Sequence, residues 1–327
     1  MKPVRRAVID VGTNSIKLLV ADVADQAVQP VWEGSIQTRL GQGFYTTHRL
    51  QPDPIAQTAE AVAVFAETAG RHNAAAIRVI ATSAARDAVN ADDLLKAIVA
   101  ASGLQVEIIS GEKEAEWAFQ GVTSDPNFAR QPLLLLDVGG GSTEFILGQG
   151  THKHFAESFP LGTVRLLEAH PPGDPPTAHE LTACRERVKK KLQETVRPKL
   201  EPALKRETAA GCVVLVGTGG TTSILARLES KLDVFHREQI EKTPLSLDRV
   251  RWHANHLWSL PLAERQQLAG LPKKRADVIL TGVVIYEAVM EQFGFTELRV
   301  STRGLRYAAL MDGVRESSQQ RMNPGKT

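Results

Sequence analysis

The sequence has no long apolar segment. No stretch reaches the roughly 18 to 20 consecutive apolar residues that a membrane-spanning helix needs, and even the run Leu133–Leu136 ends at Asp137. The basic N-terminus does not indicate a secretion signal, because Asp10 and Asn14 interrupt the apolar residues that follow it. We therefore expect a cytoplasmic protein without membrane contact.

Cysteine is scarce, and neither sign of charge is in large excess. The two cysteines, Cys184 and Cys212, are too few for a disulfide framework or a zinc site, which favours buried thiols in a reducing compartment. The 39 basic and 37 acidic residues give a net charge of +2 and no indication of a nucleic-acid partner. At 327 residues, the chain has room for two domains, each with its own core.

Two similar glycine-containing turns are present. Each is expected between apolar strands, at residues 4–9 and 16–23 for the first turn and at residues 133–136 and 144–147 for the second. When Asp10 is aligned with Asp137, 127 residues later, the two turns share Asp, Val, Gly and Ser at equal offsets. A duplicated domain explains this match better than chance does.

Helical patterns follow each pair of strands. Asp53 is expected to cap a helix that ends near Gly70, and Asn90 a helix that ends at Gly103. Further patterns are a capping box from Thr177 to Glu180 and a helix over residues 276–293. This mixture of strands and helices in both halves predicts an α/β protein.

The turns are suited to phosphate. Backbone N–H groups and hydroxyls of a glycine-rich turn can converge on one anion. The candidate phosphate ligands are Gly12, Thr13, Asn14 and Ser15 in the first turn and Gly139, Gly140, Gly141, Ser142 and Thr143 in the second. A third loop, residues 217–223, gives a weaker signal, because it lacks the complete glycine pattern of a dinucleotide site and the Gly-Lys of a P-loop.

The carboxylates of the turns suggest a cation. Asp10 and Asp137 each end an apolar strand, where an unpaired charge is costly, so we expect them to share a metal ion with Glu144 as a third ligand. Oxygen ligands beside phosphates favour Mg²⁺, with Mn²⁺ as the substitute. The alternative is that these carboxylates cap turns or pair with lysines.

A candidate base lies between the two turns. Residues 110–119 have helical spacing, and Glu114 has Trp117 and Ala118 three and four positions on. A carboxylate beside apolar side chains is suited to accept a proton. Glu112 is interpreted as a partner of the helix dipole.

Taken together, five motifs resemble the exopolyphosphatase and guanosine pentaphosphate phosphohydrolase family, within the superfamily of acetate kinase, sugar kinases, Hsp70 and actin. The motifs cover residues 10–15, 81–87, 109–115, 137–144 and 275–279, and the similarity spans almost the whole chain. It implies duplicated actin-like (ribonuclease H-like) domains with a cleft between them. The expected domains are residues 1–126 with a C-terminal helix at about 304–316, and residues 127–303, followed by a disordered tail at 317–327.

The resemblance also implies roles for particular residues. Glu114 falls on the family's catalytic base, and Asp10, Asp137 and Glu144 fall on carboxylates associated with Mg²⁺ and phosphate. Arg86 matches an arginine near bound phosphate, although a salt bridge is an equal alternative. No His-Asp dipeptide occurs, so we expect a short form without the HD-like C-terminal domain of longer relatives. A homodimer is the candidate oligomeric state.

Basic residues near the C-terminus have two interpretations. They could form a track that binds a phosphate polymer, or they could be ordinary solvated surface charges. The residues are Lys273, Lys274, Arg275, Arg303 and Arg306.

The expected reaction is hydrolytic removal of the terminal phosphate from inorganic polyphosphate. The nearest alternative is removal of the 5′-phosphate of guanosine pentaphosphate. A phosphotransferase and a non-catalytic sensor of alarmone or polyphosphate are further alternatives, and Glu114 argues against the sensor.

Overall fold

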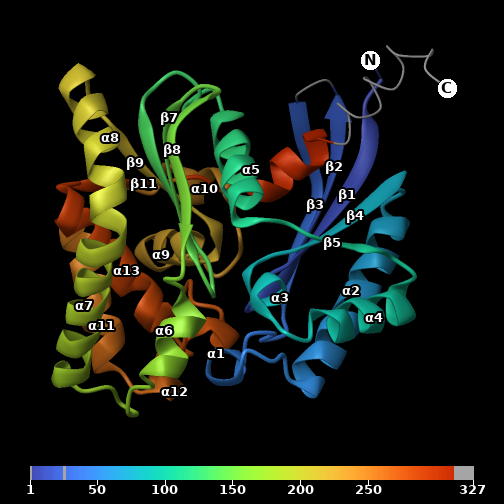
Figure 1. Ribbon diagram of the computed structural model, residues 1–327, viewed down its shortest axis with the longest axis horizontal. Coiled ribbons are helices and arrows are strands. Elements are labelled where there is room, and N and C mark those ends of the chain that lie inside the picture. The colour runs from blue at the N-terminus through green and yellow to red at the C-terminus, as the bar shows by residue number, and fades with distance from the viewer. Residues whose placement is uncertain (1, 25–26, 313–327) are drawn as a thin grey trace. The chain divides into compact units, whose positions relative to one another are not determined.

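The computed structural model describes residues 2–24 and 27–312 (Figure 1). The chain divides into unit 1, residues 1–124 and 304–327, and unit 2, residues 125–303. The sequence-based division placed the first boundary after residue 126. Residues 305–312 of the expected C-terminal helix are helical, while the predicted tail at 317–327 lies outside the described residues.

Unit 1 is built on a five-stranded sheet in the order β3-β2-β1-β4-β5. Its strands are β1 Val4–Val11, β2 Ser15–Ala24, β3 Ala27–Gln37, β4 Ala76–Ala81 and β5 Val106–Ile108. The first three strands are antiparallel neighbours, and β4 and β5 continue parallel to β1. Its helices are α1 Phe44–Thr47, α2 Pro52–Arg71, α3 Ser83–Asp87, α4 Ala91–Ser102 and α5 Gly111–Thr123.

Alternation along these strands divides the apolar side chains between two cores. Ile9 and Leu18 belong to the core that includes residues of α2 and α4. Their neighbours Val8 and Leu19 belong to a second core with Trp117 of α5, Leu305 and residues 307–310. Both faces of the sheet are thus covered, which explains why residues 7–9 of β1 and residues 18–21 of β2 are all apolar.

Unit 2 repeats this topology. Its strands are β6 Leu133–Val138, β7 Thr143–Gln149, β8 His152–Phe159, β9 Val214–Thr218, β10 Leu245–Ser246 and β11 Glu297–Val300, in the order β10-β11-β9-β6-β7-β8. The order β8-β7-β6-β9-β11 corresponds strand by strand to β3-β2-β1-β4-β5, with β10 added at one edge. The predicted duplicated α/β fold is confirmed by this repeat.

The helices of unit 2 surround a core that contains α13. They are α6 Thr163–Ala169, α7 Ala178–Lys191, the π-helix η1 Leu192–Val196, α8 Arg197–Ala210, α9 Gly219–Ser230, α10 Arg237–Lys242, α11 Leu247–Ser259, α12 Leu262–Arg265, the 3₁₀ turn η2 Lys273–Arg275 and α13 Ile279–Phe293. Every residue of α13 from Ile279 to Met290 is buried. A helix that is apolar on all sides must be enclosed by other elements.

The predicted helix ends are partly correct. The capping box of Thr177 is formed, and Asn90 and Gly103 flank α4. The first long helix, however, is capped by Gln51 and not by Asp53, because Pro52 already takes the first helical position that proline favours. The helix expected from residue 276 starts at Ile279, since residues 273–275 form a separate 3₁₀ turn.

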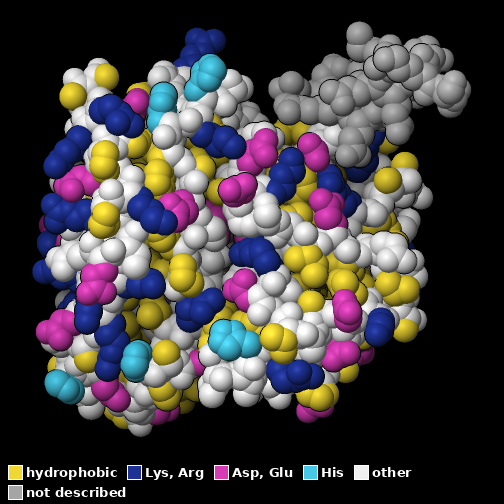
Figure 2. Space-filling view, in the orientation of Figure 1, with side chains coloured by type: hydrophobic (Ala, Val, Ile, Leu, Met, Phe, Trp, Pro, Cys, Tyr) yellow, Lys and Arg dark blue, Asp and Glu magenta, His cyan; other side chains and the backbone are white. Residues whose placement is uncertain are grey.

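The surface carries no obvious excess of one charge on the face in Figure 2, where basic and acidic side chains are interspersed. This agrees with the net charge of +2. In the described ranges, no helix combines the length and apolarity needed to cross a membrane.

Candidate active site

The two glycine turns have the same backbone arrangement. The Gly12 N–H donates to the Ser15 carbonyl over 3.2 Å, and the Gly139 N–H donates to the Ser142 carbonyl over 2.9 Å. A Cβ added to Gly12 or Gly139 would come within 3.0 or 3.1 Å of the same carbonyls. This close approach favours glycine at both positions.

The first turn and the start of α3 hold buried polar atoms that have no hydrogen-bond partner among the described residues. They are Asp10 Oδ1, Asn14 Nδ2, Ser15 Oγ and Ser83 Oγ. Each of these residues is 4 to 5% exposed. Because an unpaired buried polar group costs roughly 1–3 kcal/mol, this set is arranged for a polar ligand.

Ser83 was not among the residues selected from the sequence. It begins α3, two residues after the end of β4, and β4 pairs in parallel with β1 so that Ala81 lies opposite Val11. The carboxyl ends of adjacent parallel strands lie at the same edge of a sheet. A serine two residues beyond the end of β4 was therefore the available signal.

Asp10 has the properties of a cation ligand. Burial raises the pKa of Asp10, while the positive charges of Lys17 and Arg306 act in the opposite direction. Lys17 lies directly across the ladder from Asp10. A buried carboxylate oxygen without a hydrogen-bond donor fits a hard cation such as Mg²⁺, which prefers oxygen ligands.

Glu114 is fixed on α5 by a cap and an ion pair. Ser110 caps the helix by accepting the Lys113 N–H over 3.1 Å. Glu114 is only 7% exposed, and Arg86 Nη1 donates to its Oε2 over 3.0 Å. The same Nη1 donates to the Ile109 carbonyl over 3.1 Å. The salt-bridge alternative for Arg86 is thus present in the structure, and its contact with phosphate stays a prediction.

The carbonyls of the second turn are occupied by the start of α6. Thr163 N–H donates to the Gly139 carbonyl over 3.0 Å, and Val164 N–H donates to the Gly140 carbonyl over 2.9 Å. Gly162 must be glycine, because its Cβ would collide with the Gly140 carbonyl. In the described part of the chain, no backbone carbonyl accepts from the Gly140 or Gly141 N–H. These N–H groups are suited to an anion.

Side chains in and after the second turn are held in place by hydrogen bonds to one another. Glu144 Oε1 accepts hydrogen bonds from the hydroxyls of Ser142 and Ser158, each over 2.7 Å. The Thr143 hydroxyl donates to the Leu161 carbonyl. The structure thus gives Ser142, Thr143 and Glu144 internal partners, and their roles toward phosphate and metal stay predictions.

The third loop lies against Asp137. Gly219 has a φ of +87°, and a Cβ there would collide with Asp137 Oδ1. A Cβ on Gly220 would lie 2.6 Å from Arg275 Nη2. The sequence pattern of this loop was a weak signal, and Arg275 was interpreted as part of a basic track or as a solvated surface charge. The glycines at 219 and 220 were the signal for this close packing.

The comparisons with known proteins identify the family. The sequence matches the Ppx/GppA phosphatase family over residues 19–316. The chain belongs to this family. It is 35% identical to Exopolyphosphatase 2 of Mycobacterium tuberculosis over 95% of this chain and 97% of that protein. The predicted family is thereby confirmed, and the chain is a phosphohydrolase.

Solved structures agree with this assignment. A crystal structure of the Aquifex aeolicus Ppx/GppA family member is 28% identical, with a TM-score of 0.75 over 96% of this chain and 99% of that one. An exopolyphosphatase from Cytophaga hutchinsonii is 26% identical, with a TM-score of 0.82 over 94% of this chain and 98% of that one. The two-domain actin-like fold is confirmed.

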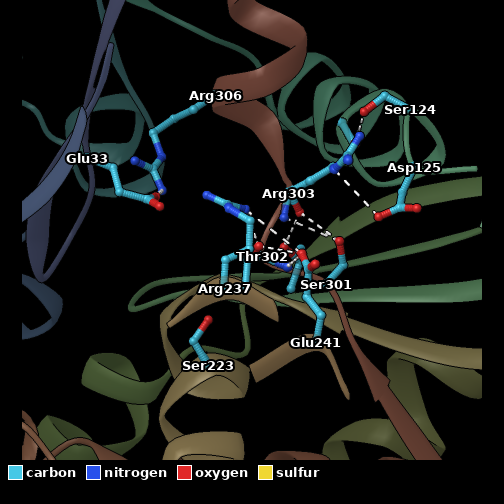
Figure 3. Close-up of polar contacts among 12 residues, drawn as sticks. Glu33, Ser124, Asp125, Ser223, Arg237, Glu241, Ser301, Thr302, Arg303 and Arg306 are labelled. Carbon is cyan, nitrogen blue, oxygen red and sulfur yellow. Dashed lines mark hydrogen bonds and ion pairs between the residues drawn. The ribbon is translucent and has the colours of Figure 1, made fainter. Parts of the chain in front are cut away.

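Two arginines of the suggested basic track have internal partners in this Ppx/GppA phosphatase. Arg303 follows β11, and its Nε lies 3.5 Å from Asp125 Oδ2 (Figure 3). The Arg303 carbonyl accepts the Thr218 hydroxyl over 2.6 Å. Arg306 belongs to unit 1, where its Nη1 donates to the Leu18 carbonyl over 3.1 Å. These contacts favour structural roles for both arginines.

The predicted metal ligands belong to different units. Asp10 lies in unit 1, and Asp137 and Glu144 lie in unit 2. Among residues 2–24 and 27–312, no three or more His, Cys, Asp or Glu side chains form a group that could hold a metal. Mg²⁺ commonly uses one or two carboxylates and completes its shell with water and substrate phosphate, so the predicted ligand set stays open.

Proposed function

We propose that this Ppx/GppA phosphatase is a Mg²⁺-dependent exopolyphosphatase that uses Glu114 as its general base. The observation that carries the proposal is the set of unpaired buried atoms at Asp10, Asn14, Ser15 and Ser83. They offer hydroxyl and amide groups for phosphate oxygens and a carboxylate for a cation. The 35% identity to Exopolyphosphatase 2 of Mycobacterium tuberculosis favours inorganic polyphosphate as the substrate.

The reaction is hydrolysis of a phosphoanhydride bond. Water attacks the terminal phosphorus, the bond to the bridging oxygen breaks, and orthophosphate leaves a chain shorter by one phosphate. Glu114 accepts the proton of the attacking water, and the Arg86 guanidinium keeps its carboxylate in one orientation. The N–H groups of the glycine turns hold phosphate oxygens. When bound at Asp10, Mg²⁺ would neutralise part of the negative charge on the phosphate.

The second candidate is 5′-phosphate removal from guanosine pentaphosphate, because the matching family includes both activities in its name. The bond broken and the role of Glu114 would be the same. A phosphotransferase would use the same turns with an acceptor other than water. A cytoplasmic location and a homodimer belong to the proposal as well.

Phosphate release from long-chain polyphosphate, guanosine pentaphosphate and ATP, measured side by side, tests the proposal. We expect the highest kcat/KM on polyphosphate, complete loss with a chelator, and recovery with Mg²⁺ or Mn²⁺. A preference for guanosine pentaphosphate would support the second candidate. Activity that survives exhaustive chelation would remove the metal from the mechanism.

A further inference from the structure

Unit 2 contains a cavity that none of the proposed active-site residues lines. It has a volume of about 350 Å³ and lies among α6, α7, α11 and the loop of residues 171–176. Leu166 of α6, Cys184 of α7 and Trp258 of α11 contribute apolar walls. Small-molecule sites typically have volumes of roughly 300–1,000 Å³, so the cavity has room for a small ligand.

The loop over the cavity is held in place by hydrogen bonds. Glu180 Oε1 accepts the Gly173 N–H over 2.9 Å, and its Oε2 accepts the Thr177 N–H over 2.7 Å. Asp174 Oδ1 accepts the Leu262 N–H over 2.7 Å. The cavity is therefore preformed, which lowers the ordering cost of binding. These donors lower the pKa of Glu180, whose negative charge already has partners.

The charges around the cavity favour an anion. Arg187 is exposed at its edge and forms no ion pair with another described residue. Burial and then the charge of Arg187 lower the pKa of His170, so its imidazole is neutral near pH 7 and offers one donor and one acceptor. Burial raises the pKa of Cys184 to about 11, so its thiol stays uncharged. The best-fitting ligand has an apolar body and one anionic group.

Helix α6 connects this cavity with the second glycine turn. At its start, the Thr163 and Val164 N–H groups donate to the carbonyls of Gly139 and Gly140. At its end, Leu166 and His170 line the cavity. The helix has only seven residues, so a shift of one end moves the other.

We propose that this cavity is a regulatory site for a small organic anion and that α6 transmits its occupancy to the second glycine turn. A ligand that displaces Leu166 or His170 would change the position of the Gly140 and Gly141 N–H groups. Phosphate binding would change with it. The effect is a change in KM, because the groups proposed to act on the attacking water belong to unit 1.

The binding test uses the fluorescent probe 8-anilinonaphthalene-1-sulfonate and its uncharged analogue N-phenyl-1-naphthylamine. Ala183→Trp fills the cavity from α7 and should abolish binding of both probes. Arg187→Gln should weaken the sulfonate by about tenfold or more, as expected for a lost charge-assisted hydrogen bond, and leave the analogue unchanged. Lys189→Gln, on α7 but outside the cavity, is the matched control. Ala169→Trp gives a second way to fill the cavity.

Turnover tests the connection through α6. Saturating sulfonate should shift KM for polyphosphate by about fivefold, within the usual range of allosteric coupling, and leave KM of folded Ala183→Trp unchanged. Probe binding that is unaffected by both filling variants would overturn the site. Inhibition that persists in Ala183→Trp would be competition at the active site and would overturn the coupling. The binding measurement needs no turnover, so it tests the cavity even if polyphosphate is not the substrate.

Discussion

The two glycine turns share a backbone and differ in the residue opposite their aspartate. In unit 1, Asp10 faces Lys17 across the β1–β2 ladder. In unit 2, Asp137 faces Glu144 at the equivalent position of the β6–β7 ladder. The duplication kept the backbone arrangement of the turn, while the facing pair is opposite in charge in unit 1 and doubly acidic in unit 2.

The turns also differ in how many of their polar groups are satisfied. Asp10, Asn14 and Ser15 have buried atoms without hydrogen-bond partners in the described residues. In unit 2, Ser142 and Glu144 bond each other, and α6 occupies the turn carbonyls. We infer that the first turn supplies side chains that need a ligand, whereas the second supplies N–H groups held in a fixed orientation.

The largest expected effect tests whether unit 1 carries the chemistry. Glu114→Gln should lower kcat by about 10²- to 10⁴-fold, the usual contribution of a general base, with little change in KM because the carboxylate acts on water. The loss could lie at the lower end, since phosphoryl transfer often needs little base assistance. Steady-state phosphate release from polyphosphate measures both constants.

The matched control for that variant is Glu112→Gln on the same helix. Glu112 is exposed, whereas Glu114 is buried against Arg86. Glu112→Gln should retain wild-type kinetics. Near-normal kcat in Glu114→Gln, together with an inactive Glu112→Gln, would reassign the base.

Asp10→Asn should weaken cation binding and strengthen the fold. We expect about a tenfold or greater rise in the Mg²⁺ concentration for half-maximal activity, because a carboxylate ligand is lost. Burial raises the pKa of Asp10. The folding penalty of its ionisation is therefore absent below the unfolded-state pKa of about 3.9 and grows as pH rises through the folded-state pKa.

The stability of this variant is measured without divalent cations. Asp10→Asn should raise Tm at pH 7 by roughly 2 °C and by less at pH 4. Asp22→Asn is a control in which Tm should change in the opposite direction and fall. The Arg5 hydrogen bond lowers the pKa of Asp22, so the charge of Asp22 is paired and stabilises the fold. A lower Tm for Asp10→Asn at pH 7 would show that the carboxylate is already compensated.

Gly162→Ala tests the fixed cradle of unit 2. Its methyl group would collide with the Gly140 carbonyl and displace the second turn, so KM for polyphosphate should rise by about tenfold with a smaller change in kcat. Gly211→Ala, where the added Cβ meets nothing within 4 Å, is the control in the same unit. An unchanged KM in Gly162→Ala would mean that the turn does not hold substrate.

Sequence patterns predicted what depends on local chemistry. The duplicated turns, the two strands around each turn and the cap at Thr177 follow from residue type and spacing. The ion pair of Arg86 with Glu114 joins residues 28 positions apart, and the approach of Arg275 to Gly220 depends on the path of η2. Such contacts are set by tertiary packing, which spacing along the chain does not encode. Ser83 could have been predicted from the sequence, because the strand order alone brings it beside the first turn.

The smallest effect tests the difference between the turns directly. Lys17→Glu gives unit 1 the facing carboxylates found in unit 2. A second carboxylate beside Asp10 should strengthen cation binding and repel phosphate. The half-saturating Mg²⁺ concentration should therefore fall and KM for polyphosphate should rise. Each change should be about threefold, which corresponds to less than about 1 kcal/mol. Lys96→Glu, on the exposed surface of α4, makes the same charge change as a control. General damage to the fold would raise both constants, so movement in opposite directions is the informative result. If both constants stay at wild-type values, the charge opposite Asp10 has no part in binding either the cation or the phosphate.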